Sequence, residues 1–263
     1  MSQKTTRRSF LKTSSEIAAV TAAVSTLGGV HTVAQEKDAK LGIGIIGCGG
    51  IMTHHVQGLV GRKEAVEIAW LCDVDPAQIE RMSKKVTDGF QAAAPKRTAH
   101  YEDVINDKNV DAVIIATPHH WHAPIAIMAM QAGKDVYCEK PLTLTIDEGK
   151  QICKAVKETG RIFQVGTQQR TEMGQKFLQA IGIIREGRIG KVTKATCNIG
   201  GGPKGGPFKK SDPPANLDWN TWLGQTPLVD YIKERCHYQF RWWYEYSGGK
   251  MTDWGAHHVD IAQ

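Results

Sequence analysis

The chain has 263 residues, of which 41% are hydrophobic and 23% are charged. This length holds one large domain or two modest ones, and it buries enough surface to fold without disulfide staples. The net charge is +6, but residues 1–34 contain four Lys or Arg and one Asp or Glu, so only +3 belongs to the remainder. That balance, with no basic stripe among aromatic residues, gives no support for nucleic-acid binding.

The amino-terminal segment is predicted to be a targeting sequence. Thr6–Lys12, with the pair Arg7-Arg8, resembles a twin-arginine export signal, and small residues that suit cleavage lie at Thr32–Ala34. The apolar stretch between them, Ile17–Val30, is too short and too rich in Ala, Thr and Ser for a transmembrane helix. We expect a protein exported in the folded state to the periplasm or another extracytoplasmic space, with residues 1–34 outside the fold. The alternative is an amphipathic helix with a chance Arg-Arg pair.

The cysteines do not form a Cys-x-x-Cys pair, and those nearest the amino terminus fall in or beside predicted strands, where cysteine packs as a small hydrophobic residue. A twin-arginine substrate folds in a reducing compartment before transport, so we expect free thiols. The six are Cys48, Cys72, Cys138, Cys153, Cys197 and Cys236.

From residue 41 onward, short apolar runs alternate with helical patterns, which is typical of β-α-β units in a parallel sheet. The predicted fold is therefore α/β, with a doubly wound Rossmann-type parallel sheet over residues 40–166. The expected strands are 41–46, 66–72, 112–116, 135–138 and 162–165, and the expected helices are 51–61, 76–89, 122–132 and 146–159.

The pattern changes after Gly166, where we place a domain boundary. A helix is expected over 175–186 and a strand over 191–199, followed by a Gly/Pro/Lys-rich loop over 200–214. Tryptophans cluster beyond it. Residues 167–263 are therefore interpreted as a partial α/β domain for substrate binding and oligomerisation, because only one clear strand is visible.

Two overlapping glycine patterns lie at the end of the first strand. Gly42-x-Gly44-x-x-Gly47 matches the dinucleotide fingerprint literally, but its spacers are strand residues, so we regard the match as coincidental. The turn Gly47–Met52 lies between strand and helix, where Gly47 permits a tight turn and Gly49 lets the backbone approach a pyrophosphate. Met52 departs from the usual Gly or Ala. The residues predicted to contact the dinucleotide here are Gly47, Gly49, Gly50 and Ile51.

Asp73, at the end of the second strand, predicts the choice of cofactor. A carboxylate at this place accepts hydrogen bonds from both ribose hydroxyls of adenosine and repels the 2′-phosphate of NADP. The following residues, Val74-Asp75-Pro76, contain no arginine, so we expect NAD rather than NADP. The alternative role for Asp73 is a helix N-cap, but Asp75 stands directly before Pro76 and suits that role better.

Cys138-Glu139-Lys140-Pro141 follows a predicted strand, at the edge where open α/β sheets bind their ligands. Lys140 there can direct its ammonium group toward a polar substrate beside a cofactor; the alternative is an ordinary surface lysine. Farther along, Asp253 and His257 are four residues apart, which places both on one face of a helix.

His257 is the natural proton acceptor of this set, because its unperturbed pKa lies near neutrality. Asp253 would orient His257 or the substrate, and Lys140 would stabilise developing alkoxide charge. The alternative is that Asp253 has only a structural role, as an acidic residue near a helix amino terminus that the helix dipole favours. A metal site of His257, His258 and Asp260 is disfavoured, because adjacent histidines point to different helix faces.

Taken in order, these motifs resemble the glucose–fructose oxidoreductase / inositol dehydrogenase / MocA (Gfo/Idh/MocA) family. They are Gly47–Met52, Ala116-Thr117-Pro118 with His122, Ala132-Gly133-Lys134 with Glu139-Lys140-Pro141, and Gly248-Gly249 with Asp253 and His257. The family implies an NAD(P)-binding Rossmann domain, then an α/β domain whose open sheet often forms oligomer contacts. Most of that sheet is missing here, so the chain looks truncated.

The resemblance also implies roles for further residues. Thr117 and Pro118 would line the cofactor, with His122 near the nicotinamide and Glu139 and Lys140 at the strand end. His119, His120 and Trp121 are expected to be loop or surface residues rather than ligands. Arg241 and Trp243 belong to a stretch with the composition of a carbohydrate site, although a packed aromatic core explains Trp242 and Trp243 equally well. The predicted substrate-binding residues are Gln168, Arg170, Arg235, His237 and Tyr238.

The predicted function is an exported NAD(P)-dependent oxidoreductase that acts on a sugar, cyclitol or glycoside, without a metal. A glycosidase of the same fold that uses bound NAD transiently is the alternative. A non-catalytic sugar-binding protein is a third reading, and the joint presence of Lys140, Asp253 and His257 argues against it.

Overall fold

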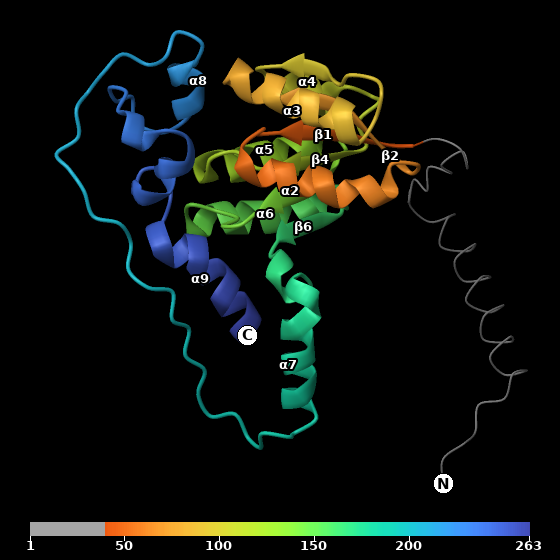
Figure 1. The fold of residues 1–263 in the computed structure, drawn as a ribbon, viewed down its shortest axis with the longest axis vertical. Helices are drawn as coiled ribbons and strands as arrows, with labels where there is room; N and C mark the ends of the chain where they lie inside the picture. The colour runs from red at the N-terminus through yellow and green to blue at the C-terminus, as the bar shows by residue number, and fades with distance from the viewer. Residues whose placement is uncertain (1–39) are drawn as a thin grey trace, which may run out of the picture. The chain divides into compact units, whose positions relative to one another are not determined.

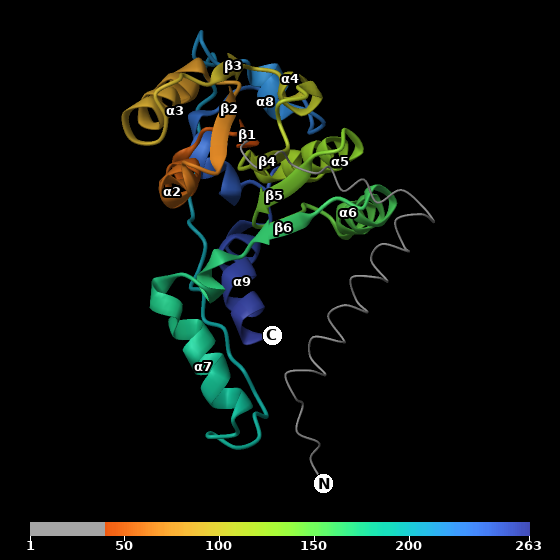
Figure 2. The same cartoon turned by 90° about the vertical axis from the view of Figure 1, so that its right-hand side faces the viewer.

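The computed structural model describes residues 40–263, so the predicted export signal lies outside the described residues. Within the described range, no helix is long and apolar enough to cross a membrane. Figures 1 and 2 show the parallel sheet with helices on both of its faces.

The six strands of the described residues form one parallel sheet in the order β3-β2-β1-β4-β5-β6, which is the Rossmann order. The central strand Leu41–Ile46 is almost entirely buried, as expected for a parallel strand that is covered by helices on both faces. The predicted doubly wound α/β fold is confirmed. The strands are β1 (Leu41–Ile46), β2 (Val66–Cys72), β3 (Lys96–Thr98), β4 (Ala112–Ile115), β5 (Asp135–Glu139) and β6 (Phe163–Gly166).

Five α-helices cover this sheet and pack its apolar side chains into two clusters. Helices α2 and α3 pack on one face, and α4, α5 and α6 pack on the other (Figure 2). Their bounds are α2 (Gly50–Leu59), α3 (Pro76–Gly89), α4 (Tyr101–Asn106), α5 (His122–Gln131) and α6 (Ile146–Thr159).

Local sequence fixes the helix ends. The Asp75 carboxylate accepts a hydrogen bond from the Ala77 N–H at 2.9 Å and caps α3, with Pro76 in the first turn, as predicted. Thr145 and Glu148 form a reciprocal capping box at the start of α6. These caps position the strand-to-helix loops that form the ligand edge of the sheet.

The remainder of the described chain is largely irregular. Helix α7 (Lys176–Arg185) follows β6, and α8 (Trp219–Leu223) and α9 (Gly249–Ala262) lie after a long stretch without regular structure. The predicted strand over 191–199 is therefore wrong. A strand needs a partner for its backbone hydrogen bonds, and no described segment pairs with these residues.

A third apolar cluster holds the later segments together. Trp219 and Trp222 stack with ring centroids 4.7 Å apart, and Tyr246 meets Trp222 edge-on at 4.9 Å. Trp243 packs against this cluster, as does Val74 from the end of β2. The cluster therefore joins the later segments to the sheet. The proposed domain division at residue 166 remains a prediction.

Candidate active site

The glycine turn after β1 has the geometry of a dinucleotide turn. Gly47 has φ +90°, and a Cβ there would lie 2.6 Å from the carbonyl of Ala116. Gly49 and Gly50 face open space, and helix α2 begins without a side-chain cap. Its first N–H groups are therefore available to an anion, as at the pyrophosphate sites of Rossmann folds.

The other glycines of the literal fingerprint serve packing. A Cβ at Gly42 would lie 1.9 Å from the carbonyl oxygen of Asn109, and one at Gly44 would lie 2.3 Å from Val104. Both glycines are inside β1, so treating that match as coincidental was correct. Met52, the departure from the fingerprint, is fully buried in the core cluster between α2 and the sheet.

Asp73 supports the turn and also lines the cavity. Its Oδ2 accepts from the Cys48 N–H at 2.8 Å, and its Oδ1 accepts from the Asp75 N–H at 2.9 Å. Burial raises the pKa of the Asp73 carboxyl, and the two N–H groups partly offset this effect. Each oxygen keeps a lone pair for a ribose hydroxyl, so the predicted role fits.

Glu139 is buried where β5 ends. Nε2 of His55 lies 2.7 Å from its Oε1, Gln168 donates to the same oxygen, and the Lys140 N–H donates to Oε2 at 3.1 Å. Gly166 on the neighbouring strand leaves room for this side chain, because a Cβ there would lie 3.1 Å from the Glu139 carboxyl. The network fixes the backbone just before Lys140.

The histidines after β4 connect segments of the chain. Both ring nitrogens of His122 lie 2.9 Å from carbonyl oxygens, those of Pro141 and Thr117. His119 Nδ1 lies 2.9 Å from Ser247 Oγ, and His120 Nε2 lies 2.9 Å from the Trp222 carbonyl oxygen. Burial lowers the pKa of all three histidines, that of His120 to about 4.

The three residues His119, His120 and Trp121 form the short 3-10 turn between β4 and α5, as expected of loop residues, but the two histidines are not on the surface. Both histidines are buried, and the Trp121 Nε1–H donates to the Trp222 carbonyl at 3.1 Å. Their polarity suggested exposure, but the later segment supplies them with buried hydrogen-bond partners that the local sequence does not reveal.

The structure brings the three predicted catalytic residues into one cavity. Lys140 Nζ donates to Asp253 Oδ1 at 2.9 Å, and Arg241 donates to Asp253 Oδ2 at 2.6 Å. The Asp253 carboxylate is thus paired with two basic side chains. Among the described residues, no hydrogen bond joins it to His257. Burial, followed by the charge of Lys140, lowers the pKa of His257.

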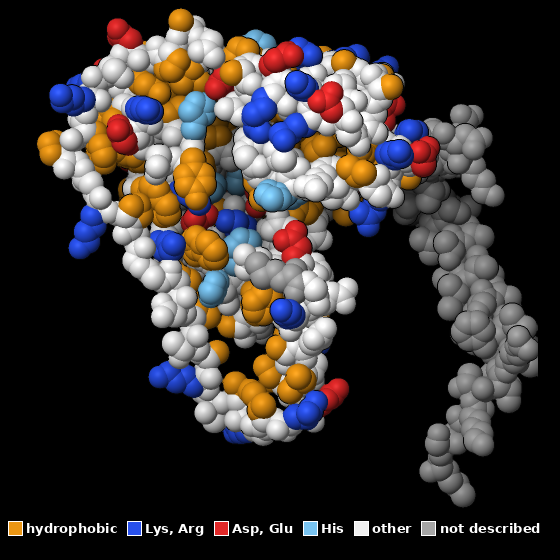
Figure 3. All heavy atoms as spheres, in the orientation of Figure 1, with side chains coloured by type: hydrophobic (Ala, Val, Ile, Leu, Met, Phe, Trp, Pro, Cys, Tyr) orange, Lys and Arg blue, Asp and Glu red, His pale blue; other side chains and the backbone are white. Residues whose placement is uncertain are grey.

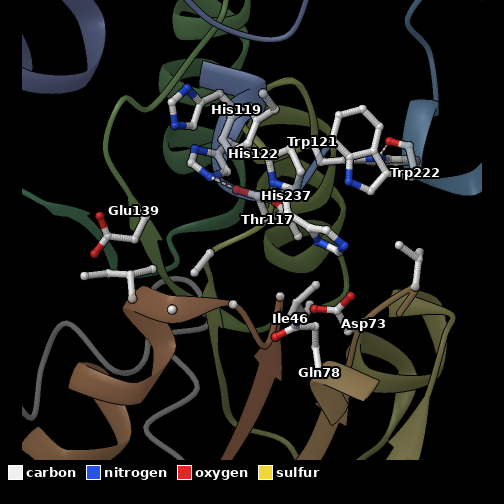
Figure 4. Close-up of a pocket in the computed structure, with 18 of the residues that line it drawn as sticks. Ile46, Asp73, Gln78, Thr117, His119, Trp121, His122, Glu139, Trp222 and His237 are labelled. Atoms are coloured by element: carbon white, nitrogen blue, oxygen red, sulfur yellow. Dashed lines mark hydrogen bonds between the residues drawn. The ribbon is translucent and has the colours of Figure 1, made fainter. Parts of the chain in front are cut away.

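The cavity has a volume of about 730 Å³ and runs from the α2 start to α9. Figure 4 shows Glu139 and Asp73 on opposite sides of it, with His119 and His122 nearby. In the space-filling view, histidine side chains gather near the middle of the face among hydrophobic ones (Figure 3). All predicted cofactor-binding residues line the cavity: Gly47, Gly49, Gly50, Ile51, Asp73, Thr117, Pro118, His122, Glu139 and Lys140.

The predicted substrate-binding residues divide into two groups. Gln168, His237 and Tyr238 line the cavity, with His237 near the Asp75 carboxylate at 3.6 Å. Arg170 and Arg235 are not part of its wall. Arg170 pairs with Asp260, and Arg235 pairs with Glu245 and stacks on Trp243.

Sequence reasoning missed part of the cavity wall. Leu217, Thr221, Trp222 and Phe240 line the cavity and were not predicted. Arg241, which also lines the cavity, was predicted only as part of a stretch with the composition of a carbohydrate site. The others lie in segments without periodicity.

A dinucleotide fits this cavity on the residues present. The α2 amino terminus is open, and two buried polar atoms of its wall, Thr117 Oγ1 and His257 Nδ1, have no hydrogen-bond partner within the described residues. Over the same range, no group of His, Cys, Asp and Glu is arranged to hold a metal ion. The fold and the cavity therefore define a dinucleotide-binding protein of the Rossmann class.

Comparison with known proteins identifies the family. Residues 41–167 match the Gfo/Idh/MocA model described as an oxidoreductase family with an NAD-binding Rossmann fold, and residues 205–263 match its C-terminal alpha/beta domain. The two matches together span more than half of the chain. The chain belongs to the Gfo/Idh/MocA oxidoreductase family.

Two curated relatives illustrate the range of this family. Inositol 2-dehydrogenase of Salmonella paratyphi B is 34% identical over 149 residues, which are 56% of this chain and 42% of the relative. Alpha-N-acetylgalactosaminidase of Shewanella oneidensis is 28% identical over 204 residues, which are 71% of this chain and 44% of the relative. The chain thus spans less than half the length of these two relatives.

Solved structures show the same fold. The crystal structure of myo-inositol 2-dehydrogenase from Lactobacillus plantarum has a TM-score of 0.52 at 31% identity, covering 59% of this chain and 43% of that one. An NAD-binding protein from Listeria innocua has a TM-score of 0.60 at 26% identity, covering 85% of this chain and 54% of that one.

Proposed function

We propose that this protein is an NAD-dependent oxidoreductase that acts on a CH–OH group of a sugar, cyclitol or glycoside. The observation that carries the proposal is the placement of Lys140, Asp253 and His257 in the cavity that also contains the dinucleotide turn. Family membership and the inositol 2-dehydrogenase relative support the substrate class.

The residues that would hold NAD are the backbone at Gly49 and Gly50 and the Asp73 carboxylate. The helix amino terminus attracts the pyrophosphate, and Asp73 accepts from ribose hydroxyls. When bound, the nicotinamide supplies a two-electron acceptor for hydride.

The protein side chains handle the proton and the developing charge. His257 is neutral near pH 7 because burial lowers its pKa, so it can accept the proton of the substrate hydroxyl. Lys140 would stabilise the oxygen as it gains negative charge, within a cavity where water does not fully screen the interaction. Loss of hydride from carbon and of the proton from oxygen leaves a carbonyl product.

The proposal is tested by incubating the purified protein with NAD and a panel of inositols, aldoses and glycosides while NADH absorbance is recorded. Formation of NADH together with one carbonyl product per NADH is expected. Absence of both, for a protein that binds NAD, would contradict the oxidoreductase assignment.

A second candidate function is an NAD-dependent glycosidase that oxidises, eliminates, adds water and reduces without net redox change. The alpha-N-acetylgalactosaminidase relative favours it, since that match covers 71% of this chain. Chromogenic glycosides separate the two functions. Release of the aglycone without accumulation of NADH indicates the glycosidase, and NADH formation without cleavage indicates the dehydrogenase.

We also propose that the full-length protein is a homo-oligomer, as the family resemblance implies. Within the described residues, α7 exposes the apolar side chains of Leu178, Ile183 and Ile184. Light scattering on the purified protein should give a mass at least twice that of one chain, and a monomer mass at micromolar concentration would contradict the proposal.

Export through the twin-arginine route is a further proposal, and it is based on the sequence of residues 1–34, in which Thr6–Lys12 is the signal motif. Replacing both Arg7 and Arg8 with Lys should leave the precursor in the cytoplasm, because the paired guanidinium groups are what the receptor reads. Cell fractionation measures the outcome. Normal periplasmic levels of the double variant would overturn the assignment.

A further inference from the structure

The Asp253 carboxylate lies between two cations. Its Oδ1 accepts from Lys140 Nζ at 2.9 Å, its Oδ2 accepts from Arg241 at 2.6 Å, and its backbone carbonyl accepts from Lys140 at 3.2 Å. Asp253 is only 2% exposed. A buried carboxylate held at both oxygens has one orientation, and that orientation determines where the Lys140 ammonium lies.

Arg241 is itself held in place. Its guanidinium carbon lies 3.6 Å from the ring centroid of Tyr238 and 4.7 Å from that of Trp242. Its Nε–H donates to the Tyr238 carbonyl at 3.1 Å. Contacts with two rings and a backbone carbonyl restrict the guanidinium, so it acts as a rigid anchor for Asp253.

We propose that Arg241 is a positioning residue for the proposed oxidoreductase reaction, and that it acts on Lys140 through Asp253. The inference rests on the proposed function of Lys140. Arg241 has two effects: it fixes the Asp253 carboxylate, and it offsets the negative charge of that carboxylate.

The second effect follows from charge balance. Asp253 paired with Lys140 alone would cancel the lysine charge, and the pair would offer little to a developing alkoxide. With Arg241 present, the three side chains carry one net positive charge inside the cavity, where such a charge is most effective. Arg241 thereby preserves the cationic character of Lys140 toward substrate.

The first test does not depend on turnover. Amine labelling of Lys140 with trinitrobenzenesulfonate, quantified by peptide mass spectrometry, should be several-fold slower in Arg241→Met than in wild type, because the Asp253 carboxylate then pairs with Lys140 alone and holds its ammonium more strongly. Asp253→Asn gives the upper limit of the rate. Lys96, which pairs with Asp107 far from the cavity, is the internal reference and should label equally in all variants. Unchanged labelling of Lys140 in Arg241→Met would overturn the proposal.

The second test measures kcat and KM with a substrate that the wild type turns over. Arg241→Met should lower kcat by about 10- to 100-fold with little change in KM for NAD, as expected when a catalytic group is displaced. Arg241→Lys should recover part of kcat, because it keeps the cation but loses the planar stack. Arg97→Met is the matched control, since Arg97 pairs with Glu80 away from the cavity.

A double-mutant cycle distinguishes positioning from independent action. If Arg241 acts through Asp253, adding Arg241→Met to the Asp253→Asn variant should lower kcat little further. Additive losses in kcat would overturn the proposal, as would loss of folding and NAD binding in both Arg241→Met and Arg241→Lys. If the wild type has no turnover, the oxidoreductase function fails, while Lys140 labelling still decides whether Arg241 orders Lys140.

Discussion

Nε2 of His55 and Oε1 of Glu139 lie 2.7 Å apart, although 84 residues separate them in the sequence. The contact joins the helix of the dinucleotide turn to the strand end that carries Lys140. Because Glu139 is buried and accepts hydrogen bonds from several donors, its carboxylate fixes the relative position of these two elements.

Glu139→Gln should therefore lower the free energy of unfolding by about 1–3 kcal/mol. The glutamine NH₂ group would replace a carboxylate oxygen that accepts a hydrogen bond, and a neighbouring N–H would lose its acceptor. Urea denaturation measures the change. Glu158→Gln is the control, because Glu158 is exposed and its ion pair with Lys154 at 3.8 Å contributes less than about 1 kcal/mol. Equal effects of the two substitutions would contradict the role of Glu139.

Lys140→Met and His257→Ala should each lower turnover by about 10²–10⁴-fold while the protein stays folded and binds NAD. The fold is expected to persist in Lys140→Met because Arg241 still pairs with the buried Asp253 carboxylate. Steady-state kinetics and NAD titration are the measurements. Near-normal turnover in either variant removes that residue from the mechanism.

Wild-type protein should bind NAD at least about tenfold more tightly than NADP, because the Asp73 carboxylate repels a 2′-phosphate. Asp73→Ser should narrow this difference and weaken NAD binding, since hydrogen bonds to a charged group contribute about 1.5–3 kcal/mol. Calorimetric titration of both cofactors tests it. Equal affinities of the wild type for NAD and NADP would contradict the predicted preference for NAD.

Gly47→Ala and Gly49→Ala should have different consequences. Gly47→Ala should destabilise the fold, because its φ of +90° costs a side chain about 1–3 kcal/mol and its Cβ would meet the Ala116 carbonyl. Gly49→Ala should keep stability but weaken NAD binding, since its Cβ would occupy the open space at the α2 start. Thermal melting and NAD titration separate the two. Gly58→Ala on α2 is the control for both.

The buried histidines predict that the protein loses stability in mild acid. Burial lowers the pKa of His120 to about 4, whereas the unfolded chain titrates near 6.5. Between these values the unfolded state binds more protons than the folded state, so the free energy of unfolding falls as the pH drops through this window. His120 alone accounts for about 3 kcal/mol.

Urea denaturation at several pH values measures this dependence. His120→Gln, which keeps a donor for the Trp222 carbonyl, should show a smaller loss of stability between pH 6.5 and pH 4 than wild type. His119 and His122 should preserve part of the slope, because burial lowers their pKa values too. A slope identical in wild type and variant would contradict the assignment to His120.

Sequence reasoning located the sheet because buried parallel strands appear as continuous apolar runs. The starts and ends of β1 and β2 were predicted to the residue. The edge strand β3, Lys96–Thr98, was missed because it is short and polar. The short helix α4, Tyr101–Asn106, was also missed. Sequence reasoning wrongly predicted a strand over 191–199, because a strand-like sequence does not supply a pairing partner.

The cofactor side of the cavity was predictable because the carboxyl ends of parallel strands converge at one edge of the sheet. The opposite wall was not. Trp222 on the short helix α8 and Phe240 in a 3-10 turn reach the cavity only through tertiary packing, as does the contact between Arg241 and Asp253. Asp253 was expected to orient His257 or the substrate, whereas the structure pairs it with Lys140 and Arg241.

The distribution of thiols makes the protein suitable for selective labelling. Cys48, Cys72, Cys138 and Cys236 are buried and free, as expected, and burial raises their pKa values, which suppresses the reactive thiolate. Cys153 on α6 and Cys197 in the irregular segment are exposed. A maleimide dye should therefore attach at these two positions and leave Cys48 in the dinucleotide turn unmodified.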